Sequence, residues 1–566
     1  MAKPTRHRNP DSSISKKNTA DRKTGQMPIN LDQTDGIGTN LRVDQTGVGF
    51  VTQDTINLAP SDIIIMNTDD KLPSQPGNSM IPARHGCVQS FLEDRSELVS
   101  IVVQAYNRLD KTKYCIECIL KYTSGIDYEL ILVDNGSTDG TLDYFKSIDV
   151  PQKKIIRVTK NIGSYVPNLL NHLSGRYFVF LPNDVYVTQN WLSNLLNCLT
   201  SDPAIGLAIS SYSNAGNSHK WGVPVTFSNF EEYQEKAARH NVSDPRLWHE
   251  RFFAIYLAIV VKKEVVDITG WLDYGFFHDH TDFDIYYRIR RAGYKVMLCK
   301  DTLVHHDHDQ FRQNNPEELE RYRNAGNADR AEFNNKYYGL DSWNDGSNYE
   351  TGMIALVNPQ EHKECKEMEI LGIDVRCGTP ILELKNKLRE AQVFDARLSA
   401  FSTDPKYWLD LKTICTGAVI VDRIEFLNEH FTDERFDYIV LGKTINSYQN
   451  PFKLLQQLLK RLKSNGHLLL KLHNTFDILS LFKTLGANIQ IEHSDDVYQL
   501  SIDELIDQIK NTGFIYKKIT VENWPLEENN LQFLRNAIKT TGFNPNPDEV
   551  FARAVVQDFV IDIARE

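Results

Sequence analysis

Cysteine is scarce in this chain, and long apolar runs are absent. The 566 residues include eight cysteines and no continuous stretch of about 18 apolar residues, which excludes a disulfide framework and a membrane-spanning helix. Cys115 and Cys118 form a Cys-x-x-Cys pair. No second pair follows at zinc-ligand spacing, so we expect ordinary packed thiols. The first basic residues precede no apolar segment, so we expect no secretory signal and a cytoplasmic location.

Net positive charge is also lacking. The chain has 63 Lys and Arg against 75 Asp and Glu, a formal net charge of −12. We therefore expect no nucleic-acid partner, and local cations wherever the protein meets an anionic substrate. The first 25 residues are the exception, because they carry seven Lys or Arg against two Asp. We expect residues 1–95 to form a polar, mostly disordered tail. The alternative is a tether to an anionic membrane surface or a partner through the basic N-terminus.

What the chain does have is a series of apolar strands that alternate with helical segments. The first series is LVSIVVQAYN (98–107), YELILVDNGSTDGT (128–141), KKIIRVTKN (153–161) and RYFVFLPND (176–184). This pattern predicts an α/β domain with a mostly parallel sheet. Ligands bind such sheets at the carboxyl ends of the strands. The polar residues expected around one crevice there are Tyr106, Asn107, Asp134, Asn135, Asn161, Asn183 and Asp184.

A second α/β pattern follows a polar, glycine-containing boundary near residues 340–358. Its strand-like runs are EILGIDV, AQVFDARL, GAVIVDRI, FDYIVLG and GHLLLKL. The sequence therefore predicts two α/β domains behind the tail. We place the first domain at residues 96–342, a linker at 343–365 and the second domain at 366–566.

Five motifs in the first domain occur in a telling order. They are SIVVQAYNR (100–108), ELILVDNGSTDGT (129–141), LPNDV (181–185), GWLDYGFFHDHTDFDIYYRIRRAGY (270–294) and DTLVHHDH (301–308). Together they resemble a family 2 glycosyltransferase of the GT-A fold. The resemblance implies inverting transfer from a nucleotide-diphosphate sugar, with UDP or dTDP, to a hydroxyl of a saccharide or glycoconjugate. It also implies a divalent metal, Mn²⁺ or Mg²⁺.

The nucleotide sugar would be held at the first strand ends. Asp134 can accept a hydrogen bond from N3–H of uracil or thymine, although an Asx turn at Asp134 would form in any case. Tyr106 would stack on the base, or pack in the core. The remaining residues that the resemblance assigns to the nucleotide sugar are Ala105, Asn107, Arg108, Asn135, Asn161, Gly163 and Asn183.

The metal site would be unusual because it has one acid. By resemblance, Asp184 occupies the metal-binding end of the family's Asp-x-Asp motif, and the amide of Asn183 stands beside it. A hard divalent cation is completed by phosphates and water, so one carboxylate can suffice. His305 and His306 are adjacent and should point to opposite faces of a strand. His306 matches the family's histidine that approaches the metal or the diphosphate.

The catalytic base should come from the run HDHTDFDIYYRIRR. Asp282 aligns with the Asp of the family's Glu-Asp motif, although Thr281 replaces the Glu. The alternative base is Asp284, which would otherwise cap a helix. Arg288 would contact phosphate, or pair with one of these acids. Trp271 would line the acceptor side, or pack in the core.

The second domain resembles a class I, S-adenosylmethionine-dependent methyltransferase over residues 366 to 540. The runs that carry the resemblance are FDYIVLGKTINSYQNPFKLLQQLLKRLKSNGHLLLKLHN (436–474) and SIDELIDQIKNTGF (501–514). The resemblance implies a Rossmann-like fold.

The cofactor positions of that family are altered here. Its Gly-x-Gly-x-Gly loop reads Arg376, Gly378, Pro380, and both replacements obstruct a close approach of the backbone to a ligand. Arg397 takes the place of the ribose-binding acid, and Asn446-Ser447 that of a Glu-His pair. We therefore expect no methyltransferase activity, and a role in docking, oligomerisation or acceptor binding. The alternatives are a bifunctional glycosyltransferase and methyltransferase, or a non-catalytic glycan-binding scaffold.

Overall fold

The computed structural model describes most of the chain beyond residue 96. The described residues are 63–66, 97–212, 223, 225–254, 257–276, 280–307, 316–479, 498–541 and 546–565. The predicted tail lies outside them, except for the short strand β1, Ile63–Met66. Among the described helices, none is both long and apolar enough to cross a membrane.

The first α/β domain is built on one ten-stranded sheet. The strand order is β1-β4-β3-β2-β5-β9-β7-β10-β6, and β8 pairs with β10. The pairs from β1 through β5 are parallel, and β9 runs antiparallel to both of its neighbours. The predicted, mostly parallel α/β sheet is confirmed. Its other strands are β2 Val99–Ala105, β3 Tyr128–Asn135, β4 Lys153–Val158, β5 Tyr177–Pro182, β6 Val185–Tyr186, β7 Ile205–Tyr212, β8 Trp248–Glu250, β9 Ile259–Lys262 and β10 Lys295–His306.

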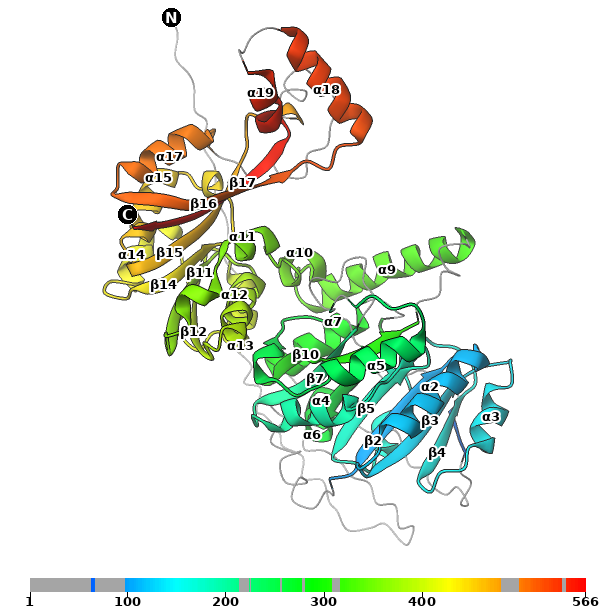
Figure 1. Cartoon of the computed structure of the whole chain (residues 1–566). Helices are drawn as coiled ribbons and strands as arrows, with labels where there is room; N and C mark the ends of the chain where they lie inside the picture. Colours follow the sequence, from blue (N-terminus) through cyan, green and yellow to red (C-terminus); the bar gives the residue numbers. More distant parts are fainter. Residues whose placement is uncertain are drawn as a thin grey trace, which may run out of the picture. The chain divides into compact units, whose positions relative to one another are not determined.

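Helices cover this sheet, as its continuously apolar strands require. In β2, Ile101 and Val103 belong to the core that includes helix α2, while Val102 belongs to a second core on the opposite face. Figure 1 shows α2 lying over β2 and β3. The helices of the domain are α2 Leu109–Tyr122, α3 Thr141–Ser147, α4 Trp191–Thr200, α5 Phe230–His240, α6 Lys263–Thr269 and α7 Thr281–Arg291.

The second α/β domain has a seven-stranded sheet in the order β13-β12-β11-β14-β15-β17-β16. The first five strands are parallel, and β17 runs antiparallel to β15 and β16. Its strands are β11 Glu367–Ile373, β12 Asp395–Ser402, β13 Val419–Val421, β14 Phe436–Leu441, β15 Leu462–His473, β16 Phe514–Asn523 and β17 Val556–Arg565. Its helices are α12 Thr379–Glu390, α13 Trp408–Ile414, α14 Leu427–His430, α15 Pro451–Leu459, α17 Ile502–Lys510, α18 Glu528–Thr541 and α19 Pro547–Ala554.

Three helices connect the two sheets: α9 Pro316–Lys336, α10 Ser342–Gly346 and α11 Thr351–Leu356. The sheets also share one continuous core, in which Ile289 of α7 and Leu384 of α12 belong to the same cluster. Buried ion pairs lie along this junction. Arg291 of α7 contacts Asp410 of α13 at 2.7 Å. Residues Leu58–Glu566 accordingly form one compact unit.

Candidate active site

The loop between β2 and α2 adopts a strained conformation that the neighbouring loops stabilise. Asn107 and Arg108 both have left-handed backbones, with φ of 53° and 59°, which costs free energy in residues other than glycine. Three hydrogen bonds compensate. The N–H of Asn107 donates to Ser137 Oγ at 2.9 Å, and its side-chain oxygen accepts from Thr138 N–H at 2.9 Å. Asn183 Nδ2 donates to the Asn107 carbonyl at 3.1 Å.

Asn183 explains why an amide stands beside Asp184. Its Nδ2 also donates to Thr112 Oγ1 in α2, at 2.8 Å. An ionised carboxylate could only accept hydrogen bonds, so it could not bind the carbonyl of Asn107. The amide therefore holds the β2–α2 loop against the end of β5, which is a structural role that the sequence did not reveal.

Asp134 is fully buried at the end of β3 and has two partners. Its Oδ1 accepts from Ser137 N–H at 2.9 Å, which is the predicted Asx-type turn. Its Oδ2 accepts from Arg157 Nη1 of β4, also at 2.9 Å. Sequence reasoning missed Arg157, although a basic residue in the apolar strand KKIIRV was a signal. A hydrogen bond from a nucleotide base would have to use a remaining lone pair of this carboxylate.

Asn135, Asn161 and Gly163 are brought together as one cluster. Asn135 Nδ2 donates to Asn161 Oδ1 at 3.1 Å and to the Gly163 carbonyl at 2.8 Å. Gln104 of β2, which sequence reasoning missed, donates to the same carbonyl at 2.9 Å. These bonds fix the loop after β4 against the ends of β2 and β3.

Tyr106 and Ala105 differ sharply in accessibility. Tyr106 is 47% exposed, so its ring is open to a ligand and does not belong to the core. Ala105 is fully buried and pairs with Asp134 across β2 and β3. Only the backbone of Ala105 is therefore suited to ligand contact.

Asp184 and His306 meet on neighbouring strand ends. Strand β10 pairs with β6 so that His306 lies opposite Val185, and His306 Nε2 is 3.5 Å from Asp184 Oδ1. Burial alone would raise the pKa of Asp184, but the hydrogen bond and charge of His306 and the charge of Lys111 outweigh it and lower that pKa. Asp184 is thus ionised at neutral pH, as a metal ligand must be. Within the described residues, no group of three or more His, Cys, Asp and Glu could hold a metal ion.

His305 takes the opposite face of β10, as predicted for adjacent strand residues. Its ring lies among aromatic rings, with the Tyr233 centroid at 5.3 Å and the Phe230 centroid at 5.4 Å. His308 lies outside the described residues. Lys111, which sequence reasoning missed, closes the site on the other side because its Nζ contacts Asp307 Oδ2 at 3.1 Å.

The two acids of α7 have different environments. Asp282 lies in the first turn and is half-buried, and its Oδ1 accepts from the N–H of Phe283 at 3.0 Å. Asp284 is fully buried and pairs with Arg288 at 2.6 Å and Lys336 at 2.7 Å. It does not cap the helix, because the N-cap residue is His280. Of the two acids, Asp282 is the one with an accessible carboxylate.

Arg288 is a structural residue, which corrects the prediction that it binds the nucleotide sugar. It is fully buried, and besides Asp284 it donates to the carbonyls of Thr269 at 2.6 Å, Gly270 at 3.1 Å and Trp271 at 2.6 Å. Its guanidinium donors are therefore used inside the domain. The pairing alternative was the correct one.

Trp271 is 3% exposed, and its ring packs at 4.7 Å from that of Phe178 and at 5.6 Å from that of Phe180. The core-packing alternative describes its surroundings in the structure.

In the second domain the corresponding strand ends are filled by the protein itself. Asp374, directly after β11, accepts from Thr403 N–H at 2.6 Å and from Tyr448 O–H at 2.8 Å. Gly378 has φ of +100°, and a Cβ there would collide with Ile414. Arg397 does not mark the end of its strand, which corrects our placement of the missing ribose acid. It is the third residue of β12, and the strand ends at Ser402.

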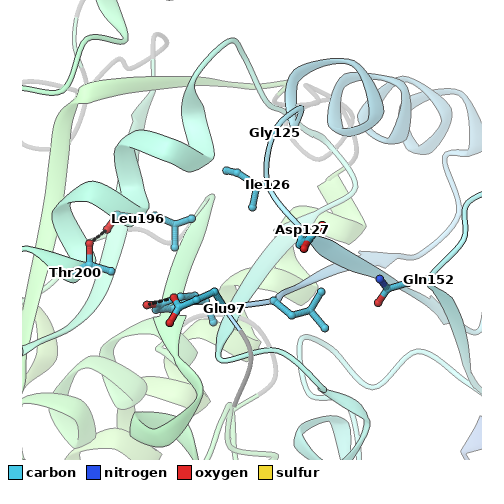
Figure 2. Close-up of a pocket in the computed structure, with 9 residues that line it drawn as sticks. Glu97, Gly125, Ile126, Asp127, Gln152, Leu196 and Thr200 are labelled. Carbon is cyan, nitrogen blue, oxygen red and sulfur yellow. Dashed lines mark hydrogen bonds between the residues drawn. The ribbon is translucent and has the colours of Figure 1, made fainter. Parts of the chain in front are cut away.

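A hollow in the first domain lies at the other edge of the sheet (Figure 2). Its lining residues are Glu97, Leu98, Gly125, Ile126, Asp127, Gln152, Tyr177, Leu196 and Thr200. Most of them precede or begin β2, β3, β4 and β5, so the hollow faces the amino ends of the strands. None of the predicted site residues lines it.

Known proteins resemble the chain in the same two regions. The model of glycosyl transferase family 2 matches residues 100–260, and a methyltransferase-domain model matches residues 271–516. The uncharacterized protein y4gI of Sinorhizobium fredii is 27% identical over 40% of this chain and 26% of that protein. Glycosyltransferase AglE of Haloferax volcanii is 23% identical over 37% and 66%. The chain thus spans less than two thirds of either relative.

A further relative is matched over more of its length. Glycosyltransferase GlyG of Streptococcus pneumoniae is 31% identical over 37% of this chain and 70% of that protein. Through its first α/β domain the chain therefore belongs to glycosyl transferase family 2, and a methyltransferase-like domain follows.

Proposed function

We propose that this protein is an inverting glycosyltransferase. It would move a sugar from a UDP- or dTDP-linked donor to a hydroxyl of a saccharide or glycoconjugate. The observation that carries the proposal is the arrangement of two accessible carboxylates in one family 2 domain. Asp184 lies beside His306, and Asp282 lies in the first turn of α7.

The nucleotide would bind over the ends of β2 and β3. Tyr106 offers an exposed ring for stacking on the base, and Asp134 offers an acceptor for the base N3–H. Arg157 holds Asp134 ionised by direct pairing. The loop containing Asn161 and Gly163 would border the ribose and the diphosphate, because it is bonded to Asn135 beside them.

Asp184 and His306 fit a divalent cation, since one carboxylate and one imidazole converge from neighbouring strands. The diphosphate and water would complete the coordination shell. When bound, Mn²⁺ or Mg²⁺ would neutralise charge on the departing diphosphate. Lys111 lies next to this pair and adds positive charge at the same strand ends.

Asp282 would act as the general base. The acceptor oxygen would bond to the anomeric carbon while the bond from that carbon to the diphosphate oxygen breaks. The hydroxyl proton would pass to Asp282, and the bonding electrons would leave with the nucleoside diphosphate. Attack on the face opposite the leaving group inverts the anomeric configuration.

The second domain would not transfer methyl groups. Asp374 is satisfied by Thr403 and Tyr448, and Asn446 is fully buried and bonded to both the N–H and the carbonyl of His473. A ligand at these strand ends would have to displace those internal bonds.

Release of nucleoside diphosphate from a panel of UDP- and dTDP-sugars tests the proposal, with Mn²⁺ or with a chelator. The wild type should turn over at least one donor with Mn²⁺ only. Asp282→Asn should abolish turnover, while Asp143→Asn, on the exposed surface of α3, should not. Turnover of no donor by the folded wild type would refute the proposal.

A further inference from the structure

Trp343 of α10 is a large exposed side chain beside the helix that carries Asp282. It is 44% exposed. Its ring centre lies 5.1 Å from that of Phe283 at an interplanar angle of 72°, and 6.3 Å from those of His280 and Phe253. Phe283 directly follows Asp282 and donates its N–H to that carboxylate. Only one side chain therefore separates Trp343 from the proposed base.

Such an arrangement suits a sugar ring. An indole packed along one edge and open on the rest keeps its place without a ligand, and few degrees of freedom are lost when a ligand stacks on it. Its face accepts the apolar C–H face of a pyranose, and its N–H can donate to a hydroxyl. A tryptophan left in water next to a catalytic carboxylate is better explained by a ligand than by the core.

The second domain holds α10 in place through Asp345. This carboxylate is buried, accepts from Tyr407 O–H at 2.7 Å and pairs with Lys406 at 3.2 Å. The Asp345 carbonyl accepts from Cys377 N–H at 3.4 Å. Tyr407, Lys406 and Cys377 all follow the carboxyl ends of β11 and β12.

The loop after β11 adds two more contacts to the same helix. Arg376 donates to the carbonyl of Asn344, and Thr379 Oγ1 donates to the carbonyl of Gly346 at 2.7 Å. Arg376 stands where the methyltransferase family has a glycine that approaches the cofactor. In this chain the loop binds the helix that presents Trp343.

We propose that Trp343 is the platform on which a saccharide ring of the acceptor stacks, and that the loop of residues 376–379 together with Tyr407 positions it. The methyltransferase-like domain thereby serves the glycosyl transfer by building the acceptor side of the first domain's site. This inference rests on the proposed function, because it requires Asp282 to face an acceptor hydroxyl.

A printed array of bacterial surface saccharides tests the platform, probed with the labelled full chain in the presence of Mn²⁺, UDP and dTDP. The wild type should bind a defined set of saccharides. Trp343→Ala should weaken that binding by about tenfold or more, and Trp343→Phe should retain most of it. The matched control is Trp408→Ala, since Trp408 of α13 is 46% exposed but belongs to the second domain; it should bind as the wild type does.

The nucleotide-dependent rise in melting temperature separates this inference from the proposed function. Unchanged saccharide binding by Trp343→Ala, or no saccharide binding by a wild type that still binds nucleotide, would overturn the platform alone. A wild type that binds no nucleotide and turns over no donor would overturn the proposed function instead.

The positioning role of the second domain has its own test in Tyr407→Phe, which removes one hydrogen bond to Asp345 without removing the ring. It should raise the acceptor KM a few-fold while donor hydrolysis in the absence of acceptor stays unchanged. Equal losses in hydrolysis and transfer, or no change in the acceptor KM, would show that Tyr407 does not position the platform.

Discussion

The two sheets end their parallel strands in contrasting ways. In the first, the strand ends leave Tyr106 exposed and place Asp184 beside His306. In the second, the equivalent edge is occupied by the chain itself, because Asp374 is bonded to Thr403 and Tyr448. A Cβ on Gly442 would lie 2.5 Å from the carbonyl of Asp374, which shows how closely β14 approaches that edge.

The contrast shows that strand order and ligand binding are set by different residues. Apolar strands determine the order of a sheet, whereas the loops after them decide whether a ligand can enter. In the second sheet the loops bind one another and α10. We therefore infer that this edge has become an internal contact surface for the first domain.

Asp282 should give the largest effect. Asp282→Asn keeps the side-chain volume and removes the base, so transfer should fall by about 10²- to 10⁴-fold with little change in stability. Rates of nucleoside diphosphate release and a denaturation midpoint measure the two quantities. Retention of more than a tenth of the wild-type rate would assign the base elsewhere.

Arg288 should behave in the opposite manner. Arg288→Met leaves Asp284 buried with a weaker set of partners, so the free energy of unfolding should fall by about 3–5 kcal/mol. Urea denaturation measures this, with Arg239→Met as the control because the Arg239–Glu235 pair is exposed. A stable Arg288→Met protein that had lost nucleotide binding would restore the ligand role we have rejected.

Asp184→Asn should reduce turnover by about 10²- to 10³-fold, because an amide is a weaker ligand for a divalent cation than a carboxylate. The Mn²⁺-dependent part of nucleotide binding should disappear with it. Calorimetric titration with UDP or dTDP, with and without Mn²⁺, measures this. Undiminished Mn²⁺-dependent binding would place the metal on other residues.

His249 tests the junction between the domains. Burial lowers the pKa of His249 to about 3 from 6.5, and Arg251 and Lys300 add to the effect. The unfolded chain takes up a proton as the pH falls below 6.5 while the folded chain does not, so stability is lost from pH 6.5 towards pH 3. This loss amounts to about 2 kcal/mol at pH 5.

His249→Gln should remove that part of the acid sensitivity. Its melting temperature should fall less between pH 7 and pH 5 than that of the wild type. His430→Gln, which alters an exposed histidine of the second domain, should leave the sensitivity unchanged. Identical acid profiles for the wild type and His249→Gln would mean that His249 is not kept neutral by burial.

The strands of both sheets were predictable because their apolar runs are long and end in polar turns. The environments of single side chains were not. Arg288 and Asp282 look equivalent on one amphipathic helix, yet one is fully buried and the other half-buried. The role of Asn183 depends on a carbonyl far away in sequence. Trp343 was read as part of a linker, because its contact with α7 is a property of packing.

Thermal shift of the full chain tests the contrast between the two sheets most directly, with UDP and dTDP, each with and without Mn²⁺, and with S-adenosylmethionine. A ligand that binds only the folded protein raises the melting temperature. We predict an Mn²⁺-dependent rise with at least one nucleotide, lost in Asp184→Asn, and no rise with S-adenosylmethionine. A rise with S-adenosylmethionine, or none with either nucleotide, would contradict this account.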